Sequence, residues 1–517
     1  MDDHPHVQVA IIGSGFAGLA MAIQLKLHGI ADFVVLERAD DVGGAWRDNT
    51  YPGCGCDVPS TLYSFSFATN PNWTASFSPQ REIHHYLRDC VRRFGLDSHL
   101  RLRHEALSAR WDEDCAYWSI ETSRGRFTTT VLVSATGQLS EPALPALPGL
   151  DRFTGTALHT SRWDHSLDLT GARVAVIGTG ASAVQLIPAI ADQVAALHVF
   201  QRTPAWVLPQ HNRVRGRLEH RAMRTFPWLH RAVRTALYWG RECALIGFTH
   251  PRIMRAVGVL ARLHLRRQVP EAALRAALTP AYTMGCKRVV RSSTFYPTLR
   301  REHVELVTDE IREVRERSVI LADGTERRLD ILVFGTGFRA AEMPMARLIR
   351  GRSGRLLAAD WQDRGAQAYL GTTVTGFPNL FLLAGPNSAL AHNSVLLGIE
   401  AQVGYVLDAL RVMRSHQLAV VEVKPHAQDA FVRDVQARMA KTVWVAGDCR
   451  SWFLDSAGRN TTVWPWPTAR LRHRTRHFQL TNYQCQQLTN YQCQIHHMDA
   501  CRCRKGTVDS DMDACRC

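Results

Sequence analysis

A strand, a glycine-rich turn and an apolar helix follow one another twice in this chain. The first copy leads from the strand at 7–12 into the turn at 13–18, and the second from the strand at 174–177 into the turn at 178–183. In a βαβ unit of this kind the turn lets a pyrophosphate approach the start of the helix. Two such units predict two dinucleotide cofactors. The expected contact residues are Gly13, Gly15, Phe16 and Gly18 in the first unit and Gly178, Gly180, Ser182 and Ala183 in the second.

The two units differ in the residue expected to meet the ribose. Glu37 ends the next strand of the first unit, where a carboxylate accepts hydrogen bonds from ribose hydroxyls. In the second unit Gln201 stands at the matching position, and Arg202 and Thr203 follow it. Loss of the carboxylate removes repulsion toward a 2′-phosphate, and Arg202 offers that phosphate a fork of donors. The second unit is therefore predicted to bind NADPH rather than NADH.

The charge of the chain is +15 over 517 residues, and the excess of arginine is concentrated at 211–301 and 470–476. No zinc-finger spacing, basic zipper or RNA-recognition sequence accompanies it, so nucleic-acid binding is not expected. A phosphate-bearing cofactor and a solvated basic helical surface account for the charge, and contact with a membrane surface stays open. The N-terminus shows no secretory signal and no apolar run is long enough to span a bilayer, so we expect a cytoplasmic protein.

A longer pattern lies just before the second unit. Residues 153–164 read Phe153-x-Gly155-x-x-x-His159-x-x-x-Trp163-Asp164. Every fixed position matches the fingerprint of the Baeyer–Villiger monooxygenases, so the chain resembles this family of class B flavoprotein monooxygenases, which are related to the flavin-containing monooxygenases. The resemblance spans roughly residues 7–476. It implies FAD in the first unit, NADPH in the second, and an organising rather than a proton-transferring role for His159.

Two further segments match the same family. One comprises Gly43-Gly44-Ala-Trp46, Tyr51-Pro-Gly53 and Asp57, and the other is Gly285-Cys-Lys287-Arg288. The resemblance implies that Asp57 and Arg288 are the catalytic residues. A flavin peroxide must stay deprotonated to attack a carbonyl, and a fixed guanidinium stabilises such an anion and the later oxyanion. Asp57 is expected to hold Arg288 through charge-assisted hydrogen bonds.

The family pattern extends the expected cofactor site beyond the two glycine turns. Lys287 is expected near the NADP phosphate, and Trp452 in a segment that closes over the nicotinamide. Val395 belongs to the flavin-domain return. The additional expected contacts are Gly44, Trp46, Asp57, Tyr63, Lys287, Arg288, Val395 and Trp452.

The expected fold class is α/β, with two Rossmann-like dinucleotide-binding domains and a helical insertion in the second. Basic amphipathic segments at 232–245 and 253–266 indicate the insertion. The expected segments are 1–140 and 377–477 for the FAD-binding domain, 150–208 and 285–376 for the NADP-binding domain, 209–284 for the insertion and 478–517 for a disordered tail.

The cysteines fall into two groups. Six of the 13 lie in the last 33 residues, among short duplications, and the other seven are scattered as reduced thiols of a cytosolic enzyme would be. The tail has Cys-x-Cys pairs but no spaced pairs with histidine partners, so no metal site is expected.

The predicted reaction inserts one oxygen atom from O2 next to a ketone carbonyl and gives an ester or lactone. Oxidation of soft nitrogen or sulfur is the alternative, and a flavin-binding regulator without turnover is a more distant one. Asp57, Trp163 and Arg288 disfavour the first alternative, and the regulator is disfavoured because a pure binder needs neither Arg288 nor a second nucleotide unit. A disulfide reductase is disfavoured because no Cys-x-x-Cys pair stands beside the flavin motifs. The walls of the substrate pocket are expected to come from loops and from the insertion, whose apolar residues, among them Trp228 and Trp239, suggest that apolar ketones would fit.

Overall fold

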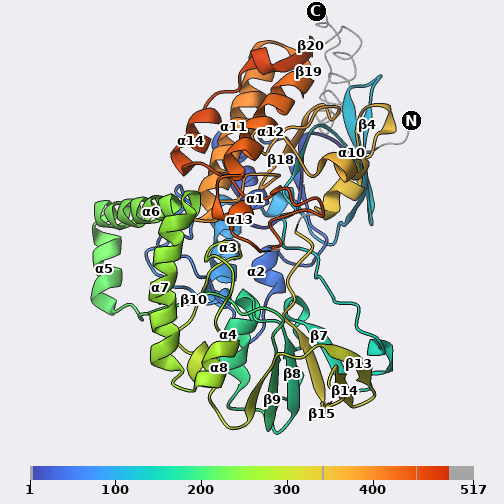
Figure 1. Cartoon of the computed structure of the whole chain (residues 1–517). Coiled ribbons are helices and arrows are strands. Elements are labelled where there is room, and N and C mark those ends of the chain that lie inside the picture. The colour runs from blue at the N-terminus through green and yellow to red at the C-terminus, as the bar shows by residue number, and fades with distance from the viewer. Residues whose placement is uncertain (1–3, 341–342, 450, 488–517) are drawn as a thin grey trace, which may run out of the picture.

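The computed structural model describes residues 4–340, 343–449 and 451–487. Within these residues, two sheets form two α/β units, one above the other in Figure 1. The first sheet has the order β17-β4-β5-β6-β1-β2-β3, and β18 pairs with β6. Its strands are β1 (His6–Ile12), β2 (Phe33–Leu36), β3 (Leu100–Arg101), β4 (Ala106–Asp112), β5 (Tyr117–Thr122), β6 (Gly125–Ser134), β17 (Ile349–Arg350) and β18 (Leu380–Leu382).

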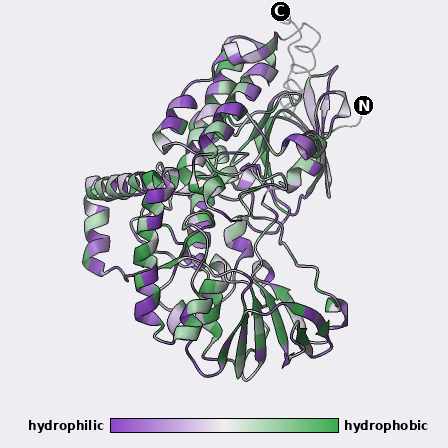
Figure 2. Ribbon diagram, viewed as in Figure 1, coloured by the Kyte–Doolittle hydropathy of each residue, from purple (hydrophilic) through white to green (hydrophobic). Residues whose placement is uncertain are grey.

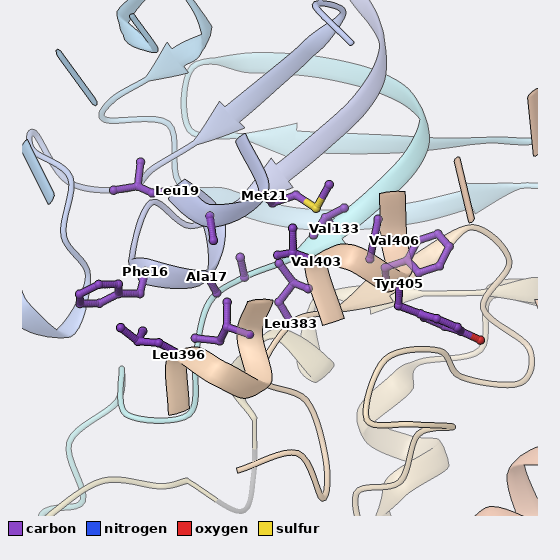
Figure 3. Close-up of a cluster of buried hydrophobic side chains, with 14 of the residues drawn as sticks. Phe16, Ala17, Leu19, Met21, Val133, Leu383, Leu396, Val403, Tyr405 and Val406 are labelled. Carbon is purple, nitrogen blue, oxygen red and sulfur yellow. The ribbon is translucent and has the colours of Figure 1, made fainter. Parts of the chain in front are cut away.

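Two helices build the core beside this sheet. Helix α1 (Phe16–Leu27) follows the first glycine turn and packs against α11 (Val395–Ser415), which comes from the far end of the chain. Leu19 and Met21 of α1 and Val406 of α11 are completely buried. Figure 3 shows their side chains in one cluster with Val133 of β6. The first glycine turn therefore lies on a rigid base. Helices α2 (Ala45–Asp48) and α3 (Gln80–Phe94) complete this side.

The second sheet has the order β12-β9-β8-β16-β7, and all its neighbours are parallel. Strongly apolar strands suit this sheet, because its central strands are buried on both faces; Figure 2 colours them mainly hydrophobic. Helix α4 (Ala181–Ile190) starts at the second glycine turn. The strands are β7 (Thr156–His159), β8 (Arg173–Ile177), β9 (Ala196–Phe200), β12 (Val304–Val307) and β16 (Ile331–Phe334), with an antiparallel group of β13 (Ile311–Arg315), β14 (Ser318–Leu321) and β15 (Glu326–Arg328).

Helices fill the chain between β10 (Val207–Leu208) and β11 (Val290–Arg291), two short strands that pair in parallel. Pro227 and Pro251 stand at the first turns of two of these helices, where proline lacks only a donor that would be unpaired anyway. The expected amphipathic segments lie within these two helices. The elements are α5 (Arg217–Thr225), α6 (Pro227–Thr249), α7 (Pro251–Gln268) and α8 (Ala272–Ala277), followed after β11 by α9 (Phe295–Thr298).

The chain returns to the first unit earlier than the expected boundary at 376/377. Ile349 of β17 pairs with Ala109 of β4, so the first sheet already contains this part of the chain. Ile349 and Trp361 of α10 (Leu357–Arg364) are buried in the same apolar cluster as Trp118. The expectation that 285–376 belongs wholly to the NADP-binding domain is therefore wrong. The burial of this apolar surface against the first sheet is the physical reason.

The expected start of the disordered tail, residue 478, is also too early in the sequence. Strand β20 (Tyr483–Gln487) pairs antiparallel with β19 (Leu418–Val423). The Tyr483 side chain is buried, and its hydroxyl hydrogen-bonds those of Thr373 and Tyr405 at 2.9 and 2.7 Å. Residues 478–487 thus belong to the fold, whereas 488–517 lie outside the described residues. The other C-terminal helices are α12 (Pro425–Met439), α13 (Val443–Ala446) and α14 (Thr468–Arg474).

Candidate active site

The first glycine turn has the shape that a dinucleotide requires. Helix α1 begins directly after Gly15, and no side chain caps its first N–H groups. These donors and the helix dipole suit a phosphate. A Cβ on Gly18 would lie 1.8 Å from the Gly13 carbonyl oxygen, so only glycine permits this approach. A Cβ on Gly44, at φ 53°, would lie 3.1 Å from the Gly15 Cα, which brings the two glycine segments together. The residues present therefore fit the pyrophosphate of FAD.

Glu37 is buried beside this turn and already has four donors. Its Oε2 accepts hydrogen bonds from the Ser14 N–H and hydroxyl at 3.0 and 2.7 Å. Its Oε1 accepts from the Ala39 N–H at 3.0 Å and from Arg47 Nη1 at 2.9 Å. Burial raises the pKa of Glu37, but Arg47 and these hydrogen bonds outweigh it and hold the pKa below its usual value. Arg47 was not foreseen, because its contact with Glu37 arises only when α2 folds back over the turn.

Three of the expected flavin contacts gather as an aromatic group. Trp46 Nε1 donates to the Tyr63 hydroxyl at 3.0 Å, and their rings meet edge to face. Phe16 meets the same tyrosine ring at a centroid distance of 5.2 Å. Val395 starts α11 and is half-buried against the core of this unit. Trp46, Tyr63 and Phe16, from three separate segments, thus form one aromatic group, in which Phe16 is the first residue of α1.

The segment from Tyr51 to Asp57 binds the second unit. The Tyr51 hydroxyl donates to Gln185 Oε1 at 2.8 Å, and Gln185 Nε2 donates to the Gly55 carbonyl at 2.9 Å. Ser182, also on α4, lies in hydrogen-bonding contact with Tyr51. Gln185 was missed by sequence reasoning, because one glutamine on an apolar helix carries no signal of its own. It fixes the loop that carries Asp57 to the NADP-binding unit.

Asp57 and Arg288 form the expected ion pair. Arg288 Nη2 donates to both carboxylate oxygens at 2.8 Å. Burial raises the pKa of Asp57, but the Arg288 charge and hydrogen bonds lower it below its usual value; Asp57 in turn raises the pKa of Arg288. The Arg288 side chain is 44% exposed, and within the described residues no acceptor binds its Nε or Nη1. A charged, fixed guanidinium thus keeps donors free for a ligand.

A second arginine adds positive potential at this place. Arg241 of α6 is close enough to lower the pKa of Asp57. Burial, followed by Arg291 nearby, lowers the pKa of Arg241 itself. Its Nε is buried and, among the described residues, has no hydrogen-bond partner. An unpaired buried donor is costly unless a ligand satisfies it. Sequence reasoning missed Arg241 because it stands among many other arginines of the insertion.

Arg202 and Lys287 come together from distant parts of the second unit. Burial lowers the pKa of Lys287, and the nearby charge of Arg202 lowers it further. Two cations this close suit a phosphate that carries two charges. Gln201 does not reach this place, because it is buried and donates to the Ala277 carbonyl at 2.9 Å. The carbonyl of Thr203 accepts from the Thr179 hydroxyl at 3.3 Å.

A disulfide connects the arginine loop to the expected closing segment. Cys286 is bonded to Cys449, with their Cα atoms 6.2 Å apart. The expectation of reduced thiols is wrong for this pair, because the fold brings together two cysteines that are 163 positions apart. Trp452 lies just beyond Cys449; it is partly exposed and its ring meets that of Phe453. The loop of Lys287 and Arg288 and the Trp452 segment are therefore covalently linked.

His159, the histidine of the family fingerprint, is held in the fold by hydrogen bonds. His159 ends β7, where its Nδ1 accepts from the Ser161 N–H at 3.1 Å. Its Nε2 lies 3.1 Å from the Gly337 carbonyl oxygen, in the turn after β16. Burial lowers its pKa below the usual value, which favours the neutral ring. The ring thus stabilises the connection between the two units through its hydrogen bonds to Ser161 and Gly337.

The two tryptophans expected among the substrate contacts do not face the interior. Trp228 and Trp239 are 64% and 58% exposed on α6. Leu237 and Tyr238 of the same helix instead pack against the core of the first unit. The expectation that Trp228 and Trp239 line the substrate site is wrong, because the helix turns them to its outer side.

Two dinucleotide-binding units that meet at an arginine–carboxylate pair define a flavin- and nicotinamide-dependent oxidoreductase. The family model described as pyridine nucleotide-disulphide oxidoreductase matches residues 10–226. A Baeyer–Villiger monooxygenase of Streptomyces coelicolor is 48% identical over 484 residues, which cover 93% of each chain. The chain therefore belongs to the Baeyer–Villiger monooxygenases and is a flavoprotein monooxygenase.

Solved structures agree with this assignment. The structure of OTEMO in complex with FAD and NADP has a TM-score of 0.85 and 26% identity, and covers 94% of this chain and 100% of its own. Cyclohexanone monooxygenase from Rhodococcus sp. Phi1, bound to NADP+, has a TM-score of 0.85 and 27% identity with the same coverage. FAD and NADPH are the cofactors of the chain.

Proposed function

We propose that the protein converts an apolar ketone into an ester or lactone at the Asp57–Arg288 pair. One ketone, one O2, one NADPH and one proton give one ester, one water and one NADP+. FAD, when bound, supplies the redox chemistry that links NADPH to oxygen. The observation that carries the proposal is the paired arginine with free Nε and Nη1 donors, at the junction of the two nucleotide units.

Arg288 is proposed to stabilise negative charge on the substrate oxygen as the carbonyl is attacked. Donors that are fixed before the reaction stabilise such charge without reorganisation in the transition state. Asp57 keeps the guanidinium in place by engaging only its Nη2. Arg241 is proposed to offset the charge of Asp57, so that the net potential of the group remains positive.

The remaining residues are proposed to bind and orient the cofactors. Arg202 and Lys287 would hold the 2′-phosphate of NADPH, and Trp452 would cover its nicotinamide. Glu37 would receive the ribose of FAD if a hydroxyl displaces Ser14 or Arg47 from its oxygens, because all four acceptor sites are filled. The proposed FAD contacts are Gly13, Gly15, Phe16, Gly18, Gly44, Trp46, Tyr63 and Val395, and those of NADPH include Gly178, Gly180, Ser182, Ala183 and Thr203.

We further propose that the protein works in the cytoplasm, where NADPH is regenerated. In that reducing compartment the Cys286–Cys449 bond would be open in part of the molecules.

Product analysis tests the proposed reaction. The purified protein with NADPH is offered linear, cyclic, aryl and steroidal ketones together with an aryl methyl sulfide, under 18O-labelled O2. We expect esters or lactones that carry one labelled oxygen. Sulfoxide as the sole product across the panel would reject the ketone assignment in favour of soft-atom oxidation.

A further inference from the structure

Exposed apolar side chains are concentrated on the helical insertion. Ten of the fifteen exposed large hydrophobic residues of the described chain fall within residues 214–263. Leu218 of α5 is 84% exposed, and Trp228 of α6 and Leu260 of α7 exceed 60%. An apolar patch of this kind on a solvent-exposed surface marks an interaction site. In Figure 1 the three helices form a bracket that projects from one edge of the molecule.

The apolar residues of α6 form one stripe. At 100° per residue, Trp228, Trp239 and Ile246 fall within about 20° of one another and span about 27 Å along the helix. Small apolar residues, Ala232 and Ala236, occupy exposed positions between them. Arg231 is the one charged residue among the exposed positions of α6, all of which the structure describes. This long stripe has no partner within the described chain.

The flanking helices are basic and almost free of acids. Helices α5 to α7 contain eleven arginines and two glutamates. Glu219 pairs with Arg213 at 2.7 Å, and Glu242 is buried, so neither offers an exposed negative charge. The exposed arginines on α5 and α7, none of which has an ion-pair partner among the described residues, are Arg217, Arg221, Arg224, Arg252, Arg255, Arg262, Arg266 and Arg267.

We propose that this insertion binds the surface of an anionic lipid bilayer. The α6 stripe enters the boundary between headgroups and acyl chains, where tryptophan partitions well, and the arginines of α5 and α7 contact anionic headgroups. None of the described helices is long and apolar enough to cross a bilayer. The contact is therefore peripheral, and it holds the enzyme where apolar substrates accumulate.

Charge complementarity favours lipid over the other occupants. A second copy would place two sets of exposed arginines against each other, and like charges across an interface oppose association. The segment 488–517 has four acidic and four basic residues, so its net charge offers no attraction to a basic face.

Vesicle flotation of the full chain tests the proposal. We expect binding to phosphatidylcholine vesicles that contain phosphatidylglycerol, weaker binding to phosphatidylcholine alone, and loss of binding as salt rises. Trp228→Ser combined with Trp239→Ser should weaken binding at least about tenfold, and Arg221→Gln with Arg252→Gln should weaken it only on the anionic vesicles. The matched control, Leu27→Ser with Leu107→Ser, removes exposed apolar residues of the first unit and should change nothing.

The readouts separate this proposal from misfolding and from dimerisation. FAD content and NADPH oxidation without lipid should match the parent in every variant, because these side chains face solvent. Equal binding by the parent and the double tryptophan variant would overturn the proposal. A lipid-free dimer that the tryptophan variant abolishes would assign the face to a second copy instead.

Discussion

At the scale of single residues, a substitution of Arg288 should separate FAD binding from oxygenation of the ketone. Arg288→Ala should retain FAD, because the glycine turn and Glu37 lie elsewhere. Oxygenation of the ketone should fall by about 10²–10³, the loss seen when one oxyanion donor is removed. NADPH that is still consumed should then yield hydrogen peroxide. Stopped-flow absorbance with ester and peroxide assays measures both.

Two companion variants sharpen this result. Asp57→Ala should give a milder shift from ester to peroxide, because it loosens Arg288 without removing it. Arg288→Lys keeps the positive charge but loses the planar guanidinium with its several donors, and should recover only part of the rate of ester formation. Ester formation at the parent rate in Arg288→Ala would remove this residue from the mechanism.

Arg202 should set the preference for NADPH. Arg202→Ala is expected to lose about 1.5–3 kcal/mol of binding, which corresponds to a roughly 10- to 150-fold higher KM for NADPH and little change for NADH. Arg124→Ala, an exposed arginine of the first unit, is the matched control. Equal losses with both nucleotides would show that Arg202 does not meet the 2′-phosphate.

The sequence predicted those residues whose type and spacing carry chemistry. The glycine turns are local motifs, and Asp57 and Arg288 stand in segments that resemble the family pattern, so these residues could be named before any contact was known. Arg47, Gln185 and Arg241 could not, because their importance arises from packing between segments distant in sequence.

At the scale of elements, β20 is a strand that the hydrophobic periodicity of the sequence does not predict. The central strands are apolar on both faces and easy to recognise, whereas only Tyr483 of β20 is buried. A polar edge strand beside a duplicated sequence looks like a linker. The helices of the insertion were predictable in position, but their outward apolar side was not.

The two possible C-terminal truncations should therefore behave differently. A chain that ends at Gln487 should keep its FAD content and its thermal midpoint. A chain that ends at His477 loses the partner of β19 and the buried Phe478 and Tyr483, and removing one buried aromatic residue costs about 3–5 kcal/mol. Scanning calorimetry with flavin quantification measures this. Identical midpoints would show that β20 adds no stability.

At the scale of the whole molecule, a buried carboxylate ties the insertion to the first unit. Glu242 of α6 accepts hydrogen bonds from the Thr468 N–H at 3.0 Å and from Asn393 Nδ2 at 2.8 Å. Burial raises its pKa, but hydrogen bonds from His392, Thr468 and Asn393 outweigh this and lower the pKa from 4.5 to about 2. The ionised form thus holds three segments together.

This lowered pKa predicts acid sensitivity. The stability that Glu242 contributes is present above pH 4.5 and is lost as the pH falls toward 2, by at most about 3 kcal/mol. Glu242→Gln should be less stable at neutral pH and should lose this part of the pH dependence. Urea unfolding of both proteins between pH 7 and 3 measures it. Parallel curves for the parent and the variant would contradict this assignment.

The bond between Cys286 and Cys449 also acts on the unfolded chain. It closes a loop across 163 positions that includes parts of both units. Such a loop removes conformational entropy from the denatured ensemble, worth about 5 kcal/mol at this length. Dithiothreitol, or Cys449→Ser, should therefore lower the thermal midpoint, whereas Cys243→Ser, an exposed free thiol, should not. The resistance of this protein to heat would then report the redox state of its surroundings, independently of whether either nucleotide is bound.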